Sequence, residues 1–269
     1  MRLVRYALLG IGGLLLLLVA AAALVVLLFD PNAHKADLQR LVRAQTGREL
    51  TLAGDLQLRL FPWVAVETGR ATLGNATGFG AAPMVEIEHA RLGLKLLPLL
   101  HRRLEIAAIR VDAPTIRLAV DATGRNNWAD LAPQTANAVP ADEAGAMAAI
   151  SVAGLQITRG TLLYADHQAD SKIALRDLNV TTGALAVGKP FKLRLSGTLQ
   201  QGGSLTVGLN VSALARVNPD AARYQLAAPV IALQLKGAGL PAAGLAVNMR
   251  FDRIDADLAK QTVALPGME

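Results

Sequence analysis

Hydrophobic and polar residues alternate along most of the chain from Glu49 onward. A period of two is typical of β-strands that have one apolar face and one wetter face. Turn residues between the segments, such as Gln201-Gly202-Gly203, predict antiparallel neighbours joined by short turns. The phase slips near Arg253-Ile254, as a β-bulge would make it do. The apolar positions of the predicted strands form one set: Leu56, Leu58, Leu60, Val64, Val66, Leu92, Leu94, Leu96, Ile116, Leu118, Val120, Phe191, Leu193, Leu195, Leu205, Val207, Leu209, Ile231, Leu233, Leu235, Leu245, Val247 and Met249.

A helical period precedes these strands. Asp30 can cap a first turn, Pro31 is tolerated at the first helical position, and Gly47 is suited to end the helix. The spacing i, i+3, i+4, i+7 is met by Leu38, Leu41, Val42 and Gln45. We expect an amphipathic helix over residues 31–46. It either packs on the first strands and closes the end of the sheet, which is the favoured interpretation, or lies on a membrane surface.

Residues 6–29 form an apolar run without a charged side chain. About 20 helical residues cross a bilayer core about 30 Å thick, and a helix satisfies its backbone groups internally. This run therefore predicts a transmembrane anchor. A cleaved signal peptide is the competing interpretation, but its apolar region would run only about 7–15 residues. Arg2 and Arg5 precede the run, so residues 1–5 are expected to be cytoplasmic and the main domain to be exported.

Residues 134–149 are small and polar without periodicity, and they predict a loop or linker. The expected organisation is therefore a helix and strands over 30–133, this linker, and further strands over 150–269. The chain contains no cysteine, which excludes thiolate metal sites and cysteine nucleophiles.

The formal net charge of +6 favours an anionic partner, either nucleic acid or lipid. The basic residues are scattered along strands without aromatic stacking positions between them, so we expect no nucleic-acid partner. Lipid headgroups are the expected anionic neighbour of a tethered, exported chain. The basic segment His101, Arg102 and Arg103 is a weak candidate for headgroup contact, and solvation at a turn explains it more simply.

Candidate catalytic and metal sites are weak. The four histidines His34, His89, His101 and His167 lack the spacing of a ligand pair on one element. Asp252, Asp255 and Asp257 do not follow the spacing of a calcium loop. No serine stands in a nucleophile turn. We expect neither an enzyme nor a bound cofactor or metal.

The alternation leaves open what covers the apolar strand faces, because no amphipathic helix is visible after residue 47. Two sheets can cover each other at a separation of about 10 Å. Alternatively, one sheet can curl into a trough whose apolar lining is left for acyl chains. The pattern alone favours the filled sandwich.

The ordered series of short motifs resembles the AsmA family over most of the chain. After the apolar run the matching segments are Asp30-Pro31-Asn32, Thr46-Gly47-Arg48, Leu52-Ala53-Gly54-Asp55-Leu56, Phe61-Pro62, Gly78-Phe79-Gly80, Pro83, Leu97-Pro98-Leu99-Leu100, Pro114, Asn127-Trp128-Ala129-Asp130-Leu131, Gly160-Thr161-Leu162, Tyr164 and Asp166. This resemblance implies a mainly β fold: a transmembrane helix and a short amphipathic helix, followed by a long curled antiparallel sheet that forms an open hydrophobic groove. It reverses the preference for a sandwich.

The resemblance also implies a function. Family members are inner-membrane-anchored periplasmic proteins of Gram-negative bacteria and are similar to bridge-like lipid-transfer proteins. The implied role is movement of phospholipid along the groove toward the outer membrane, in support of outer-membrane assembly. The alternative is a non-catalytic assembly factor or scaffold that binds outer-membrane or other envelope proteins. Family members are usually longer, so this chain is expected to be a truncated member.

Overall fold

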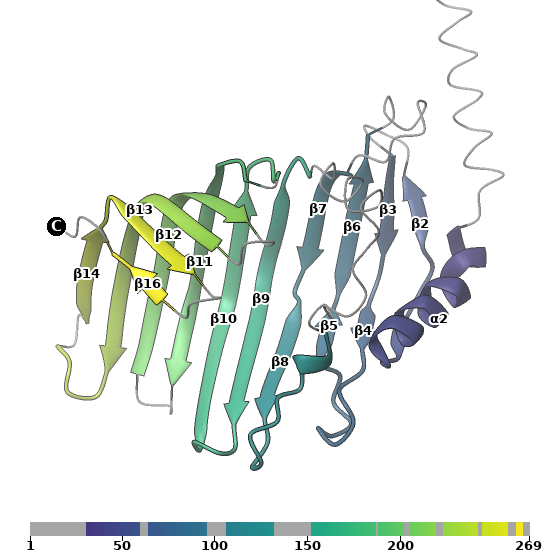
Figure 1. Cartoon of the computed structure of the whole chain (residues 1–269), viewed down its shortest axis with the longest axis horizontal. Coiled ribbons are helices and arrows are strands. Elements are labelled where there is room, and N and C mark those ends of the chain that lie inside the picture. The colour runs from purple at the N-terminus through teal and green to yellow at the C-terminus, as the bar shows by residue number, and fades with distance from the viewer. Residues whose placement is uncertain are drawn as a thin grey trace, which may run out of the picture.

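The computed structural model describes residues 31–59, 64–95, 106–131, 152–186, 188–201, 205–218, 223–241, 244–257 and 262–265. These residues form three helical elements, η1 (Pro31–His34), α2 (Lys35–Thr46) and η2 (Ala129–Leu131), and one 16-stranded sheet. The shorter strands come first: β1 (Leu50–Leu52), β2 (Gln57–Arg59), β3 (Val64–Thr68), β4 (Ala71–Leu73), β5 (Val85–Ile87), β6 (His89–Leu94), β7 (Ile106–Asp112) and β8 (Thr115–Val120). The later strands are β9 (Leu155–Asp166), β10 (Ser171–Thr182), β11 (Phe191–Gln201), β12 (Leu205–Asn218), β13 (Arg223–Gly237), β14 (Leu245–Arg250), β15 (Arg253–Asp257) and β16 (Thr262–Ala264). Figure 1 shows the strands side by side, with α2 beside β2 and β4 at one end and β14 at the other.

The helix predicted over residues 31–46 is confirmed as η1 followed by α2. It ends at Gly47, whose φ of 68° is the left-handed conformation that glycine adopts readily. Its orientation differs from the expectation. Leu38 and Leu41 are exposed, and Gln39 and Val42 lie on the less exposed side.

The sheet branches at β9. One series of strands, β1-β4-β5-β8, reaches residues 161–166 of β9, and the series β2-β3-β6-β7 reaches residues 155–158. Both β7 and β8 run parallel to β9, whereas the other strand pairs are antiparallel. The expectation of a wholly antiparallel sheet is therefore wrong at this point. The physical reason is the long connection between β8 and β9, since a parallel pair requires a crossover of a dozen or more residues.

Three non-glycine residues with positive φ lie side by side across neighbouring strands. Ala113 separates β7 from β8, Arg159 interrupts β9, and Asp177 interrupts β10, with φ of 46°, 54° and 52°. The amide of Ala113 donates to the Thr158 carbonyl at 2.8 Å, and the amide of Arg159 donates to the Asn179 side chain at 3.2 Å. Bulges of this kind bend a strand and increase its twist. We call this line of bulges, at Ala113, Arg159 and Asp177, the crease.

A second bend lies in β13 at Ala228, where φ is 46° and the register with β12 shifts. On the neighbouring strands the apolar positions change from odd numbers, as at Met249, to even numbers, as at Ile254. The phase slip predicted near Arg253-Ile254 is thereby confirmed. The pairing of Gln201 with Leu205 likewise confirms the predicted hairpin between β11 and β12.

The described strands belong to one sheet and not to two separate packed sheets. Every pair of strands that makes more than marginal contact is also a hydrogen-bonded pair within this sheet. No leucine or isoleucine whose side chain is described is fully buried. The buried apolar side chains of the described part are few and mostly small: Val64, Ala65, Ala71, Met84, Ala107, Ala215 and Pro229. The filled sandwich that the pattern alone favoured is wrong, because one sheet has no partner sheet with which to interdigitate. The described fold is a long, open, curled sheet.

A buried polar cluster fastens the helix end to the sheet. The guanidinium of Arg48, just after α2, is 1% exposed and contacts Asp130 of η2 at 2.5 and 3.3 Å. It also donates to the backbone carbonyl of Asn127 at 2.6 Å. Asn127 is fully buried; its amide donates to Asn75 and to the carbonyl of Arg117, each at 2.9 Å. We call Arg48, Asn75, Asn127 and Asp130 the clasp. Asn127 is the fully buried residue of this turn.

Several predictions fall outside the described residues: the cytoplasmic segment 1–5, the anchor 6–29, the linker 134–149, Leu60, Leu96, and the basic segment His101, Arg102 and Arg103. Within the described part, neither α2 nor any other helix has the length and hydrophobicity to cross a membrane.

Candidate functional site

The apolar side chains of the strands are brought onto one face of the sheet by its register. Residues directly opposite each other in paired strands point to the same face. One directly paired row crosses ten strands from β1 to β14: Leu50, Leu73, Val85, Ile116, Leu162, Leu175, Leu199, Val207, Leu235 and Leu245. We call these ten residues the apolar row and the face that carries them the apolar face. At a strand spacing of about 4.8 Å, nine gaps give the row a length of roughly 43 Å.

Parallel rows enlarge this face. Leu195 pairs with Val211, Ile231 and Met249 across β11–β14, and the next row contains Leu209, Leu233 and Val247. In the other branch, a row runs through Leu58, Val66, Leu92, Ile109 and Leu155. Leu118 pairs with Tyr164, and Val120 with Asp166 at the strand end. Phe191, Leu193 and Leu205 share the face through their partners Ala215, Ala213 and Gly237.

Most of the predicted groove residues therefore lie together, and a few do not. Leu56 lies before β2, where its backbone exchanges hydrogen bonds with Asn32, so the strand predicted to include it begins one residue later. Val64 is only 7% exposed and is closed to a ligand. The backbone of Leu94 pairs with Val64. Leu60 and Leu96 are outside the described residues.

The apolar face is open to contact along its length. Nine members of the apolar row are half-buried, and Leu245 is 47% exposed. A hollow of about 540 Å³ lies on this face, with residues of β9 to β13 in its wall. Phe191, Leu193, Val180 and Leu226 line it, together with Leu185 from the segment after β10. Its volume falls within the range of about 300–1,000 Å³ that is usual for ligand sites.

The opposite face is predominantly polar. A row of Thr51, Thr72, Glu86, Thr115 and Thr161 lies one residue out of phase with the apolar row. From β10 to β15 every regularly paired basic side chain belongs to this second face: Lys172, Arg176, Lys192, Arg194, Arg216, Arg223, Lys236, Arg250 and Arg253. We call it the polar face, although Leu163, Leu214 and Val230 also belong to it.

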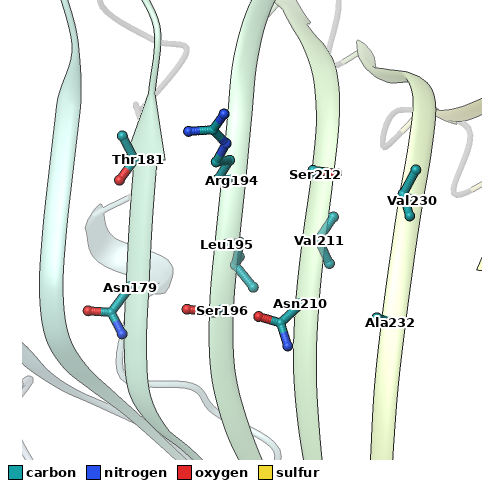
Figure 2. Close-up of a pocket in the computed structure, with 10 residues that line it drawn as sticks. All are labelled: Asn179, Thr181, Arg194, Leu195, Ser196, Asn210, Val211, Ser212, Val230 and Ala232. Carbon is teal, nitrogen blue, oxygen red and sulfur yellow. The ribbon is translucent and has the colours of Figure 1, made fainter. Parts of the chain in front are cut away.

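The polar face has a shallow hollow of about 350 Å³ in the middle of the long strands. Figure 2 shows two rows across it. Thr181, Arg194, Ser212 and Val230 form one row, and Asn179, Ser196, Asn210 and Ala232 form the other. Hydroxyl, amide and guanidinium groups at such an open surface are well hydrated, so this hollow is unsuited to an acyl chain.

Charged contacts hold the polar side of the crease. Arg159 binds the carboxylate of Asp112 at 2.5 and 3.1 Å and lies 3.5 Å from Glu88. The hydroxyl of Thr158 donates to Asp112 at 2.6 Å. The hydrogen bond from Arg159, followed by that from Thr158, lowers the pKa of Asp112 to about 2. Asp112 is therefore ionised at neutral pH, and the pair stabilises the bent backbone between β7 and β9.

Sequence analysis did not identify the clasp or the crease. Clasp residues come from segments far apart in sequence, and the bulge residues include no glycine to mark them. Asp255 and Asp257 of the aspartate cluster are engaged by protein: Asp255 by Gln225 and Arg253, and Asp257 by Arg223 at 3.6 Å. Among the described residues, no group of three or more histidine, aspartate or glutamate side chains is arranged to hold a metal ion.

The described part of the chain thus combines a single sheet that has an apolar face, a clasped helix and a parallel branch point. The model of the AsmA family matches residues 1–266 of this chain. The chain belongs to the AsmA family. Protein AsmA of Escherichia coli (strain K12) is 28% identical to it over 226 residues. The aligned part covers 81% of this chain and 35% of that protein, so the chain spans about a third of the relative's length.

The AsmA-family motifs that carried the resemblance have a structural role here. Thr46-Gly47-Arg48 ends α2 and supplies the buried guanidinium. The backbone carbonyl of Asn127 and the carboxylate of Asp130, both in a second motif, accept hydrogen bonds from this guanidinium. These two motifs therefore mark the junction between helix and sheet. Most of the apolar face follows from alternation, although the motif residues Leu162 and Tyr164 also lie on it.

Proposed function

We propose that this AsmA-family chain is an envelope protein that carries phospholipid along the apolar face of its sheet. In this proposal, residues 6–29 anchor it in the inner membrane and the sheet lies in the periplasm. Lipid moves along the face toward the outer membrane and so supports outer-membrane assembly. The observation that carries the proposal is the apolar row, which crosses ten strands of one open sheet.

Acyl chains complement such a face physically. Burying hydrocarbon contributes about 0.8 kcal/mol per methylene, so ten methylenes in contact offer about 8 kcal/mol without any specific contact. Side chains such as Leu199 and Val207 supply apolar contact, while headgroups stay in water at the rim. Because every position along the row is similar, a tail can shift from one strand to the next without losing its apolar contacts. No bond is made or broken in this process.

The apolar hollow is the best-defined place for a tail to bind. Phe191 and Leu193 of β11 line it, and residues of β9 and β13 flank them. Lys192 lies between these two in sequence but on the polar face. Lipid bound there would contact alternate residues of β11, which makes the proposal testable at the level of single side chains.

A scaffold for envelope proteins is the second candidate function. Leu245, Val263 and Leu265 are 47%, 66% and 49% exposed at the C-terminal end of the sheet, where a protein partner could bind. A scaffold of this kind would bring protein partners with it on purification and would hold no lipid on the apolar face.

Lipid extraction from the purified chain, followed by mass spectrometry, tests the proposal. The double variant Leu199→Asp/Val207→Asp places two charges in the apolar row. Thr198→Asp/Thr206→Asp is the matched control, because it places the same charges on the same two strands but on the polar face. We expect the first variant to lose most of the bound phospholipid and the control to retain it. Equal retention by both variants, or no lipid on the unmodified chain, would contradict the proposal.

A further inference from the structure

Helix α2 presents two leucines to solvent. Leu38 and Leu41 are 43% and 53% exposed, although the apolar side of a surface helix normally faces the sheet on which it packs. The less exposed side of the helix instead carries Lys35, Gln39 and Val42.

Contacts at the first turn fix this orientation. The side chain of Asn32 exchanges two hydrogen bonds with the backbone of Leu56, at 2.8 and 3.1 Å. The ammonium group of Lys35 binds the carbonyl of Gly54 and lies 3.4 Å from Asp55. Because both contacts hold the same side of the helix against the loop before β2, the helix cannot turn its leucines inward without breaking them.

The chain before α2 indicates what the exposed leucines contact. The apolar run that we propose as the anchor ends at Phe29, and η1 begins at Pro31. At 1.5 Å per helical residue, Leu38 lies roughly 12 Å along the helix from Asp30. A headgroup region of about 5–8 Å on each side of the hydrocarbon core is therefore within reach of this segment.

Basic residues on the polar side of α2 suit an anionic bilayer. Arg40 and Arg43 are exposed, and at about 100° per residue they lie away from the two leucines. Asp37, which lies nearer the leucines, is paired with Arg40 and lies 3.7 Å from His34, so its charge is offset locally. Interfacial helices combine an apolar stripe with Lys and Arg on the polar face.

We infer that α2 lies along the surface of an anionic lipid bilayer, with Leu38 and Leu41 inserted at the level of the headgroups. The inference rests on the proposed anchor and adds a second contact with the same membrane. It places the first strands of the sheet next to the bilayer, so that the apolar face starts where lipid would enter.

Single-cysteine labelling of the full chain tests the inference, because no native cysteine competes. An environment-sensitive fluorophore is attached at Leu41→Cys, and at Ala44→Cys, a neighbouring exposed position that keeps both leucines. Ala246→Cys, which is exposed on the polar face of β14, is the matched control. Each protein is reconstituted into vesicles of phosphatidylethanolamine and phosphatidylglycerol, with and without brominated lipid.

We expect the emission of both α2 labels to shift to shorter wavelength and to be quenched by brominated lipid, with no change at position 246. Replacing phosphatidylglycerol by phosphatidylcholine should reduce the shift. If the chain floats with vesicles while the α2 labels stay in water, this inference fails and the anchor stands. If the chain does not float, both fail. A shift of the α2 labels to shorter wavelength without quenching by brominated lipid would indicate that Leu38 and Leu41 contact protein instead of lipid. That result would overturn the inference.

Discussion

Arg48 and Asp130 are 82 positions apart in sequence and form a bidentate pair, with contacts of 2.5 and 3.3 Å. The arginine side chain is 1% exposed, whereas the aspartate is 46% exposed. The pair connects the end of α2 to η2, and the apolar face begins at the strands that flank this junction.

Removing the acidic partner should destabilise the fold. Asp130→Ala leaves the guanidinium of Arg48 buried without its anion, and an unsatisfied buried group of this kind costs about 1–3 kcal/mol, more when it is charged. The urea midpoint should fall accordingly. Asp55→Ala, which removes a carboxylate that is 82% exposed, serves as the control and should leave the midpoint nearly unchanged. An equal effect of the two substitutions would contradict the role of the clasp.

An alanine at Gly197, which lies beside the crease, should destabilise the fold more than an alanine at Gly208. A Cβ at Gly197 would lie 3.1 Å from Leu175 and 3.3 Å from the carbonyl of Arg176, next to the bulge in β10. Overpacking at such a site typically costs about 1–3 kcal/mol. At Gly208, on the neighbouring strand β12, the nearest atom is 3.6 Å away, so an alanine fits. Gly197→Ala should lower the denaturation midpoint, and Gly208→Ala should leave it unchanged or raise it slightly.

Acid should weaken the contact between Arg159 and Asp112. The folded-state pKa of Asp112 is about 2, below the ordinary value of 3.8, so its stabilising contribution is complete above about pH 4 and is lost as pH falls through about 2. The stability difference between the unmodified chain and Asp112→Asn should be constant at neutral pH and shrink between about pH 4 and pH 2. Thermal unfolding across this range measures it. In an Arg159→Gln background the difference at neutral pH should be smaller, and a pH-independent difference in the unmodified background would exclude the ion pair.

Leucines on an open face should contribute less to stability than leucines in a core. Leu209 is half-buried and directly paired with Leu233. A fully buried Leu→Ala substitution costs about 2–5 kcal/mol. Leu209→Ala, unfolded in the absence of lipid, should therefore cost less than about 2 kcal/mol. A cost at the upper end of the range for buried leucine would indicate a filled core over this face.

The local pattern of the sequence predicts most of the sheet correctly. Alternation depends only on neighbouring residues, so it places Leu193 and Leu195 on one side and Arg194 on the other without knowledge of the fold. The same reasoning could not decide between a sandwich and an open sheet, because both produce identical strands. The family resemblance supplied that choice, and the single described sheet agrees with it.

The features that sequence reasoning missed depend on contacts between distant segments. Arg159 and Asp177 have positive φ, and neither residue is a glycine that would mark the bulge. The side chain of Asn179 accepts a hydrogen bond from the amide of Arg159 on the neighbouring strand and donates one to the carbonyl of Asp177. The outward position of Leu38 is set by contacts of Asn32 and Lys35 with a loop about 20 residues later in the chain. Helical periodicity identifies an apolar stripe but cannot say which side of the helix will meet the sheet.

Photo-crosslinking along β11 tests the central claim most directly. A photoreactive amino acid is placed in turn at Lys192, Leu193, Arg194, Leu195, Thr198 and Leu199, and covalent adducts are identified by mass spectrometry after irradiation in cells. The account predicts phospholipid adducts at Leu193, Leu195 and Leu199, and none at the three intervening polar-face positions. Adducts at Lys192, Arg194 and Thr198, or adducts without a period of two, would show that the apolar face does not carry lipid.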